Sequence, residues 1–524
     1  MRRGPMAADG SDHRPALPHI VLALADDLGH NGIGLRNPRL KTPALDRLAK
    51  AGVVLEEFYT APTCAPARAS LLTSRWSFKA LSGNNAYFWV EEGVHEEYAA
   101  LLPAALSRRG YVTRMVGKWH AGHYRRSLLP TSRGFGSFFG FLSGCEDHLT
   151  QENCCRRCPQ TTVIDLFRDD RPARGENGSD NSAAFAREAC RIVRDHAAAH
   201  GPLAGRRRRP LFLYYALQDV HSPFQVQPRY EALYSSSVRQ FNVWAGMVSA
   251  VDEAVHNVSL ELRRAGMWRT TLFVLMGDNG SPVGCGPEWC AGSNAPLKGG
   301  KNTLWEGGVR APAILSGGWL PSRQHGKHLW GLAHMVDVGP TLCALSGGPC
   351  TAMEEGPSSV DGLDLSRWLS GDAESSPRAH VVLEHTLVAA AGRRRKRRRP
   401  PESPLFANST GGVRVGDWKL IVGGQQYEGH YGDFSPNGTD LAVDERRGAT
   451  PSSCRARPCL FNVRDDPTER DDLASTRKDK LDELGAAFRA LEHLFHAPRP
   501  TVSSRELYCA AAAASGGFMV PWRS

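Results

Sequence analysis

Runs of apolar residues that end abruptly in polar turns recur along the first half of the chain. They cover residues 19–25, 111–116, 211–217 and 271–276. Runs that are apolar throughout, rather than at every second position, are typical of central parallel strands buried on both faces. Helical patterns lie between them, for example at residues 42–49 and 241–264. This alternation predicts an α/β fold with a mostly parallel central sheet sandwiched by helices.

Polar residues follow directly where each apolar run ends. In chain order they are Asp26 and Asp27, then Lys118 and His120, then Asp219 and His221, and finally Asp278 and Asn279. In open α/β sheets, ligands bind at the carboxyl ends of the strands. We therefore expect these side chains, although far apart in sequence, to meet at one edge of the sheet and to form a site there.

A cysteine stands just before a helical pattern in residues 62–75, which read PTCAPARASLLTSR. Pro66 suits the first turn of a helix, which would put Cys64 at its N-terminus, where unpaired N–H groups favour an anion. Arg68, one turn further on, could hold an oxygen or a charged substrate. For a lone cysteine the ordinary interpretation is a buried thiol or half of a disulfide.

The acidic strand ends offer only oxygen ligands. Asp26, Asp27, Asp278 and Asn279 suit Ca²⁺ or Mg²⁺ better than zinc, which prefers histidine or cysteine. The alternative is that each pair simply caps a turn. Two such pairs at strand ends favour a metal site. Cations and proton donors that could clamp a doubly charged ester beside this metal are Lys118, His120, His221 and Lys301, with Lys298 as the alternative to Lys301.

The pattern changes beyond about residue 375. Alternating apolar positions at 412–422 predict a hairpin, residues 459–463 a further strand, and residues 476–494 a helix. We therefore predict a disordered tail at 1–17, a large α/β domain at 18–380, and a smaller C-terminal subdomain with an antiparallel sheet at 381–524. Residues 389–404 form a basic, low-complexity insertion in that subdomain.

The composition describes a soluble globular protein with a local excess of arginine. The 524 residues are 41% hydrophobic and 23% charged, with a formal net charge of +10. Much of the excess lies in two runs, residues 206–209 and 393–399. We interpret these runs as solvated insertions and expect no nucleic-acid partner, with a polyanion contact as the alternative.

The chain has 13 cysteines, more than is usual in a cytosolic protein. Without Cys64 an even number remains, so all of them could pair. Close spacings favour local loop closures among Cys154, Cys155 and Cys158, and in the pairs Cys285/Cys290, Cys343/Cys350 and Cys454/Cys459. A zinc site at Cys154, Cys155 and Cys158 is the alternative.

Some sequence features indicate passage through the secretory pathway, and others do not. Asparagines in glycosylation triplets stand at positions 177, 257, 408 and 437. No signal peptide is visible in the sequence as given, and no apolar run is long enough to span a membrane. The cysteines and the triplets favour an oxidising compartment.

Taken together, these strings resemble the type I sulfatases of the alkaline-phosphatase superfamily, over residues 19–473. The resemblance rests on ADDLG at 25–29, the Cys64 segment, GKWH at 117–120, HSP at 221–223, GDNG at 277–280 and LWEGGVR at 304–310. With PLKGGK at 296–301, the chain looks most like the arylsulfatase B (N-acetylgalactosamine-4-sulfatase) branch. Ser74 stands where the family usually has glycine.

The resemblance implies a role for each matching position. Asp26, Asp27, Asp278 and Asn279, with the modified Cys64, would hold one Ca²⁺. Cys64 would be oxidised to formylglycine, whose hydrate attacks sulfur and releases the alcohol, and whose second hydroxyl then expels sulfate. Arg68 and Lys118 would hold the formylglycine and sulfate oxygens. His120 would take a proton during sulfate elimination, and His221 and Lys301 would bind sulfate and assist the leaving oxygen.

The resemblance also implies partners and location. The substrate would be a small sulfate ester or a sulfated glycan, the formylglycine-generating enzyme would modify Cys64 during biosynthesis, and the protein would be lysosomal or secreted. Two other functions stay open from the sequence. One is a phosphomonoester or phosphodiester hydrolase on the same scaffold with unmodified Cys64, and the other is a non-catalytic polyanion-binding protein that uses the arginine runs.

Overall fold

The computed structural model describes most of the chain. The described residues are 17–81, 93–155, 158–200, 208–284, 290–387, 409–425, 457–491 and 504–523, with the single residues 429, 454 and 494. The predicted tail, apart from residue 17, and the basic insertion at 389–404 lie outside them. So do the glycosylation triplets at 408 and 437, residues 206 and 207 of the first arginine run, and all of the second run.

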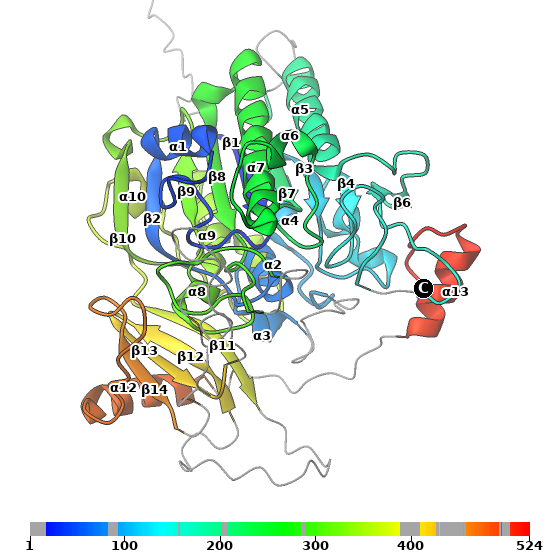
Figure 1. The fold of residues 1–524 in the computed structure, drawn as a ribbon. Coiled ribbons are helices and arrows are strands. Elements are labelled where there is room, and N and C mark those ends of the chain that lie inside the picture. Colours follow the sequence, from blue (N-terminus) through cyan, green and yellow to red (C-terminus); the bar gives the residue numbers. More distant parts are fainter. Residues whose placement is uncertain are drawn as a thin grey trace, which may run out of the picture.

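A ten-stranded sheet forms the centre of the molecule (Figure 1). Its strand order is β10-β2-β9-β8-β1-β7-β3-β4-β5-β6. The strands are β1 (His19–Ala25), β2 (Val53–Tyr59), β3 (Val112–Lys118), β4 (Ser137–Phe141), β5 (Phe167–Arg168), β6 (Arg171–Pro172), β7 (Leu211–Leu217), β8 (Thr271–Gly277), β9 (Ala313–Ser316) and β10 (Lys327–His334). The middle strands from β8 to β4 are parallel, as predicted, and β9, β5 and β6 run antiparallel to their neighbours.

Helices cover both faces of this sheet. They are α1 (Pro43–Lys50), α2 (Cys64–Thr73), α3 (Ser77–Ala80), α4 (Leu102–Arg108), α5 (Asn181–His200), α6 (Pro228–Glu231), α7 (Arg239–Arg264), α8 (Glu306–Val309), α9 (Val338–Leu345) and α10 (Ser366–Ser370). Alternate residues of β1 face opposite cores. Ile20, Leu22 and Leu24 pack with α2, α4 and α9, whereas Val21 and Ala23 pack with α1, α5 and α7. Burial on both faces explains why this strand is apolar throughout.

A separate four-stranded antiparallel sheet follows, with strand order β11-β12-β13-β14. Its strands are β11 (His380–Leu387), β12 (Ser409–Val415), β13 (Trp418–Val422) and β14 (Cys459–Asn462). One face packs against α12 (Lys478–Arg489) through Leu420 and Phe488. The other face packs against the large domain, where Ile421 shares a core with Trp305. The predicted antiparallel sheet is therefore present, and both of its faces are buried.

The last described segment returns to the large sheet. Helix α13 (Arg505–Ala514) contributes Tyr508 and Ala512 to the same core as α2 and α4, and a disulfide joins Cys509 to Cys158. Figure 1 shows α13 beside β6, away from the four-stranded sheet. We propose a domain boundary at residue 380, as predicted. Residues 504–523, which follow the smaller subdomain in sequence, pack with the large domain instead.

The cysteines pair only in part as predicted. Cys343–Cys350 and Cys454–Cys459 are disulfides, and Cys290 is disulfide-bonded, while its expected partner Cys285 lies outside the described residues. The local closures expected among Cys154, Cys155 and Cys158 were wrong, and so was the zinc site. The chain folds back so that Cys145 bonds Cys154, and Cys158 bonds Cys509 across 351 positions. The cysteines besides Cys64 could all have paired by number, but Cys155 and Cys190 are free thiols.

A histidine pair lies at the opposite edge of the sheet from the predicted site. The rings of His19 and His196 meet edge to face with their centroids 5.4 Å apart. Burial lowers the pKa of His19 to about 4. Burial, followed by the proximity of His19 and His200, lowers the pKa of His196 to about 3. Both imidazoles are therefore neutral in the folded protein at pH 5.

This pair predicts a loss of stability in acid. As pH falls below about 6.5, the unfolded chain binds protons that the folded histidines exclude, so the free energy of unfolding decreases towards pH 4. We expect His196→Gln, whose amide can still donate to the Arg209 carbonyl that His196 now contacts at 3.0 Å, to remove on the order of 2 kcal/mol of this acid dependence. Urea unfolding at pH 7 and pH 4.5 measures it. Equal pH dependence in both proteins would contradict the prediction.

No helix among the described residues is long and apolar enough to cross a membrane.

Candidate active site

The predicted site residues meet at the carboxyl edge of four adjacent strands. In the strand order β8-β1-β7-β3, these strands end beside Asp278, Asp26, Asp219 and Lys118. Backbone hydrogen bonds hold the strand ends in register, since the Asp26 amide donates to the Asp219 carbonyl at 3.0 Å and the Asp278 amide to the Ala25 carbonyl at 3.1 Å. The parallel arrangement thus converts residues more than 250 positions apart into neighbours.

Cys64 is the first residue of α2 and is buried, with 4% of its surface exposed. Thr63 before it is extended, and Pro66 lies in the first turn, as predicted. Burial raises the pKa of the Cys64 thiol to about 12, although Lys118 and Lys301 act to lower it. The unmodified thiol therefore stays protonated near neutral pH in this environment, which makes it a poor nucleophile.

Arg68, one turn along α2, ties the helix to two strand ends. Its guanidinium donates to Oδ2 of Asp278 at 3.0 and 3.2 Å and to the Lys118 carbonyl at 2.8 Å. The Lys118 ammonium in turn lies 2.5 Å from Oδ2 of Asp26. Burial alone would raise the pKa of Asp26, but Lys118, His221, Arg68 and Lys301 outweigh it and hold that pKa well below its usual range. Asp26 is therefore a buried carboxylate.

Lys301, rather than Lys298, reaches the acidic cluster. Its ammonium lies 2.7 Å from Oδ1 and 2.9 Å from Oδ2 of Asp27. Lys298 instead places its ammonium over the Trp305 ring, 3.7 Å from the ring centroid. Burial opposes the charge on Lys301, but Asp27, residue 64 and Asp26 outweigh it and raise the pKa of this lysine.

The two histidines of the site differ in their contacts. Neither ring nitrogen of His120 has a hydrogen-bond partner among the described residues, although the ring is buried. His221 donates from Nδ1 to the Ser222 carbonyl at 2.6 Å, and its Nε2 lies 3.7 Å from Oδ2 of Asp27. Burial is the main cause that lowers the pKa of both rings, to about 4 for His221. Both are thus neutral imidazoles that offer ring nitrogens to a ligand.

The oxygen atoms of this cluster fit a hard cation. Oδ1 of Asp26 and Oδ1 of Asn279 are buried and have no hydrogen-bond partner among the described residues, which is costly unless an ion or a water lies there. Four side chains offer ligand atoms that all lie within 4.8 Å of one another: Asp26, Asp27, Cys64 and His221. His221, which we predicted to bind sulfate and assist the leaving oxygen, is therefore also placed as a possible metal ligand.

Asp278 and Asn279 lie beside this group. Asp278 accepts from the Asp27 amide at 3.0 Å as well as from Arg68, and the Asn279 amide nitrogen donates to Oδ1 of Asp27 at 2.7 Å. This leaves Oδ1 of Asn279 available to a cation. All five predicted metal ligands are therefore gathered at one place, and both Asp27 and Asp278 contact protein donors through both carboxylate oxygens.

No pattern in the sequence indicates the residues that hold His221 in position. His148, in the loop after β4, donates from Nε2 to the His221 carbonyl at 3.0 Å, and its Nδ1 lies 3.6 Å from Asp219. The hydroxyl of Ser182, at the start of α5, donates to the same Asp219 carboxyl. Of these three residues, only Asp219 was predicted from the sequence, as a polar residue that follows an apolar run.

We compared the chain with protein families and with known proteins. The sulfatase family model matches residues 18–348. The chain belongs to the sulfatase family. Arylsulfatase J of Mus musculus is 33% identical over 463 residues, which cover 87% of this chain and 73% of that protein. N-acetylgalactosamine-6-sulfatase of Rattus norvegicus is 30% identical over 372 residues, covering 67% of this chain and 65% of that protein.

Solved structures of other proteins share the fold. Ps i-CgsB in complex with k-i-k-neocarrahexaose has a TM-score of 0.71 at 24% identity, with 95% of this chain and 98% of that one covered. A phosphonate monoester hydrolase of Agrobacterium radiobacter has a TM-score of 0.54 at 16% identity, with 91% and 95% covered. The predicted family, the fold and sulfuric ester hydrolysis are thus confirmed, whereas the arylsulfatase B branch is not singled out. Sulfatases act through a formylglycine and a divalent metal ion.

Proposed function

We propose that this sulfatase hydrolyses a sulfate ester of a sugar, through a formylglycine made from Cys64 and with one bound Ca²⁺. The observation that carries the proposal is the position of Cys64, buried at the N-terminus of α2 between the cations Lys118 and Lys301 and the carboxylates of Asp26 and Asp27. The names of relatives, such as N-acetylgalactosamine-6-sulfatase, support a sugar as the alcohol.

The ligands of the cation would be Asp26, Asp27, Asp278, Asn279 and residue 64. Carboxylate and amide oxygens favour Ca²⁺ over softer metals. A bound Ca²⁺ supplies positive charge that polarises the nucleophile and the sulfate oxygens. The two orphaned oxygens, Oδ1 of Asp26 and Oδ1 of Asn279, support this assignment because they have no other partner among the described residues.

The remaining side chains divide the work of binding and proton transfer. Lys118 and Lys301 hold the sulfate oxygens, and Arg68 fixes residue 64 and Lys118 in place through its bonds to Asp278 and the Lys118 carbonyl. Because Nδ1 of His221 donates to the Ser222 carbonyl, protonation of the leaving oxygen would use Nε2 of the imidazolium, a form that an anionic sulfate bound beside the ring favours. His120 has both ring nitrogens free among the described residues, and so it takes the proton during sulfate elimination.

The modification of Cys64 requires a formylglycine-generating enzyme as a partner during biosynthesis. The disulfides support folding in an oxidising compartment, and we extend the proposal to a lysosomal or secreted location. Among the triplets in the described residues, Asn177 is exposed, which suits a glycosylation site.

The choice of reacting group is tested by comparing nitrophenyl sulfate with nitrophenyl phosphate. We expect kcat/KM for the sulfate to exceed that for the phosphate. We test a phosphate ester because a phosphonate monoester hydrolase shares the fold. Faster turnover of the phosphate than of the sulfate would support a phosphoryl hydrolase and overturn the proposal.

Removal of the metal gives a further prediction. Exhaustive chelation should lower the activity at least about 100-fold and lower the midpoint of thermal unfolding, because buried carboxylates then repel one another. Re-addition of Ca²⁺ should restore both. An unchanged midpoint and full activity in the chelated protein, with metal content verified by elemental analysis, would contradict the assignment of a metal to this cluster.

A further inference from the structure

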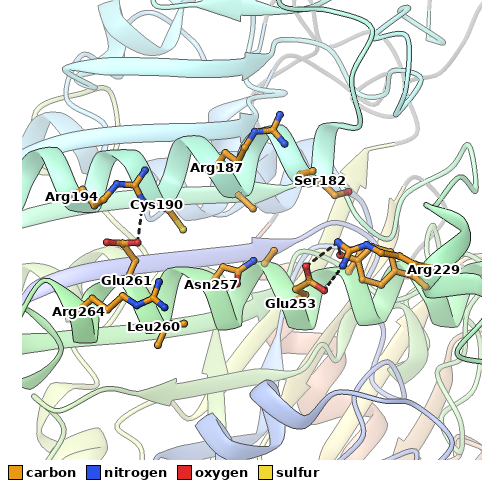
Figure 2. A pocket seen from close by; sticks show the side chains of 15 residues that line it. Ser182, Arg187, Cys190, Arg194, Arg229, Glu253, Asn257, Leu260, Glu261 and Arg264 are labelled. Atoms are coloured by element: carbon orange, nitrogen blue, oxygen red, sulfur yellow. Dashed lines mark hydrogen bonds and ion pairs between the residues drawn. The ribbon is translucent and has the colours of Figure 1, made fainter.

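A groove runs between α5 and α7 on the outside of the large domain (Figure 2). Its volume is about 440 Å³. Small residues of both helices leave room for it, namely Ala183 and Ala186 on α5 and Ala250 and Ala254 on α7. Arg229 and Tyr230 of α6 also line it. None of these residues takes part in the sulfatase site.

The groove carries an excess of positive charge. Four arginines and two glutamates line the groove, and each glutamate forms an ion pair with one arginine. Glu253 holds Arg229 through contacts of 2.9 and 3.1 Å, and Glu261 accepts from Arg194 across the groove at 3.0 Å. Two arginines, Arg187 on α5 and Arg264 on α7, form no hydrogen bond or ion pair with any described residue.

Unpaired guanidinium groups on facing helices favour a particular ligand. Guanidinium presents a planar fork of donors that matches carboxylate, sulfate and phosphate oxygens. The side chain of Asn257 lies between the two helices in Figure 2 and adds a neutral donor and acceptor. In Figure 2 the Arg264 side chain lies in the groove, whereas the Arg187 side chain extends from α5 at the outer rim, on the side away from α7. An arginine in the groove, an arginine at its rim and an amide between the helices suit an anionic sugar better than an apolar ligand.

The groove begins near the catalytic edge. Ser182, which lines one end, donates to Asp219, and Asp219 stands two positions before His221. From Ser182 to Arg194 the groove follows α5 for about 18 Å at the helical rise of 1.5 Å per residue. It therefore leads from the neighbourhood of the site along the side of the molecule.

We propose that the α5–α7 groove binds a second anionic group, a sulfate or a carboxylate, on the same glycan whose sulfate ester is hydrolysed. The inference rests on the proposed function for the identity of the ligand, but binding in the groove needs no catalysis. Arg264 in the groove and Arg187 at its rim are the main contacts for the charged groups of this glycan, and the substrate is accordingly an oligosaccharide or polysaccharide with more than one negative charge rather than a monosulfated monosaccharide.

Binding is measured with the inactive Cys64→Ala protein, so that no turnover intervenes. Chondroitin sulfate hexasaccharide is titrated by calorimetry into this protein and into the same protein carrying Arg187→Ala and Arg264→Ala. We expect the affinity to fall roughly tenfold or more and its dependence on salt to become weaker, since two charge-assisted contacts are lost. The matched control replaces Arg171 and Arg269, two exposed arginines outside the groove, and should leave the affinity unchanged.

Equal affinity and equal salt dependence in the groove variant and the control would overturn the proposal. In the active protein, Arg187→Ala with Arg264→Ala should leave kcat/KM for nitrophenyl sulfate unchanged, which separates failure of the groove from failure of the sulfatase assignment. A glycan on Asn257, which stands in a glycosylation triplet, would fill the groove. A hexosamine mass on the peptide that contains Asn257 would therefore also overturn the proposal.

Discussion

Replacement of Cys64 by alanine is expected to lower kcat for an aryl sulfate by a factor on the order of 10⁴ or more, because the reaction then has no covalent nucleophile. Cys64 is buried at the first position of α2. Initial rates with nitrophenyl sulfate at saturating concentration measure the effect.

The control for this prediction is Cys190→Ala, which removes a free thiol on α5, outside the catalytic cluster. It should keep most of the activity. Thermal unfolding of Cys64→Ala should remain close to that of the unmodified sequence, because alanine fits the buried position. Retention of aryl sulfate turnover by a correctly folded Cys64→Ala protein would rule out the proposed nucleophile.

The largest effect on stability is expected from Lys419→Met. Lys419 on β13 is fully buried and lies 2.9 Å from a carboxylate oxygen of Glu306 and 2.8 Å from one of Glu469. Glu306 also accepts from the Tyr59 hydroxyl at 2.7 Å, so the network joins the four-stranded sheet to the large domain. Without the lysine, Glu469 loses its ion pair and Glu306 keeps a longer pair with Arg310 at 3.5 Å, and breaking this buried network costs about 3–5 kcal/mol.

Urea unfolding compares Lys419→Met with Lys480→Met, which breaks an exposed pair with Glu483 on α12 and should cost less than about 1 kcal/mol. Adding Glu469→Gln to Lys419→Met should recover part of the loss, since it removes the carboxylate that has lost its ion pair. A loss for Lys419→Met no larger than that for Lys480→Met would show that the network does not hold the two sheets together.

Much of the fold could be predicted from the apolar runs. The run at 19–25 corresponds to β1 and the run at 211–217 to β7 without a change of boundary, because strands buried on both faces carry an unambiguous pattern. The strand order could not be predicted. Nothing in the sequence of β9 indicates that it runs antiparallel between β2 and β8, since this depends on how the chain returns to the sheet.

The candidate site was visible because its residues follow strand ends and match family strings. Ser74, the departure from those strings, has a φ of 56° and ends α2 in a left-handed conformation, which explains why relatives favour glycine there. His148 could not be predicted, because it lies in an irregular loop and acts through the His221 carbonyl. The Cys158–Cys509 disulfide was missed for a related reason, since only the three-dimensional fold brings α13 to that loop.

The modification of Cys64 is the central claim, and the mass of one peptide tests it most directly. The protein is produced in a host that has the formylglycine-generating enzyme, digested, and the peptide that spans Cys64 is weighed. We predict a mass about 18 Da below that of the cysteine form, as expected when the thiol is replaced by an aldehyde. An unmodified cysteine at position 64 in an active preparation would contradict the account.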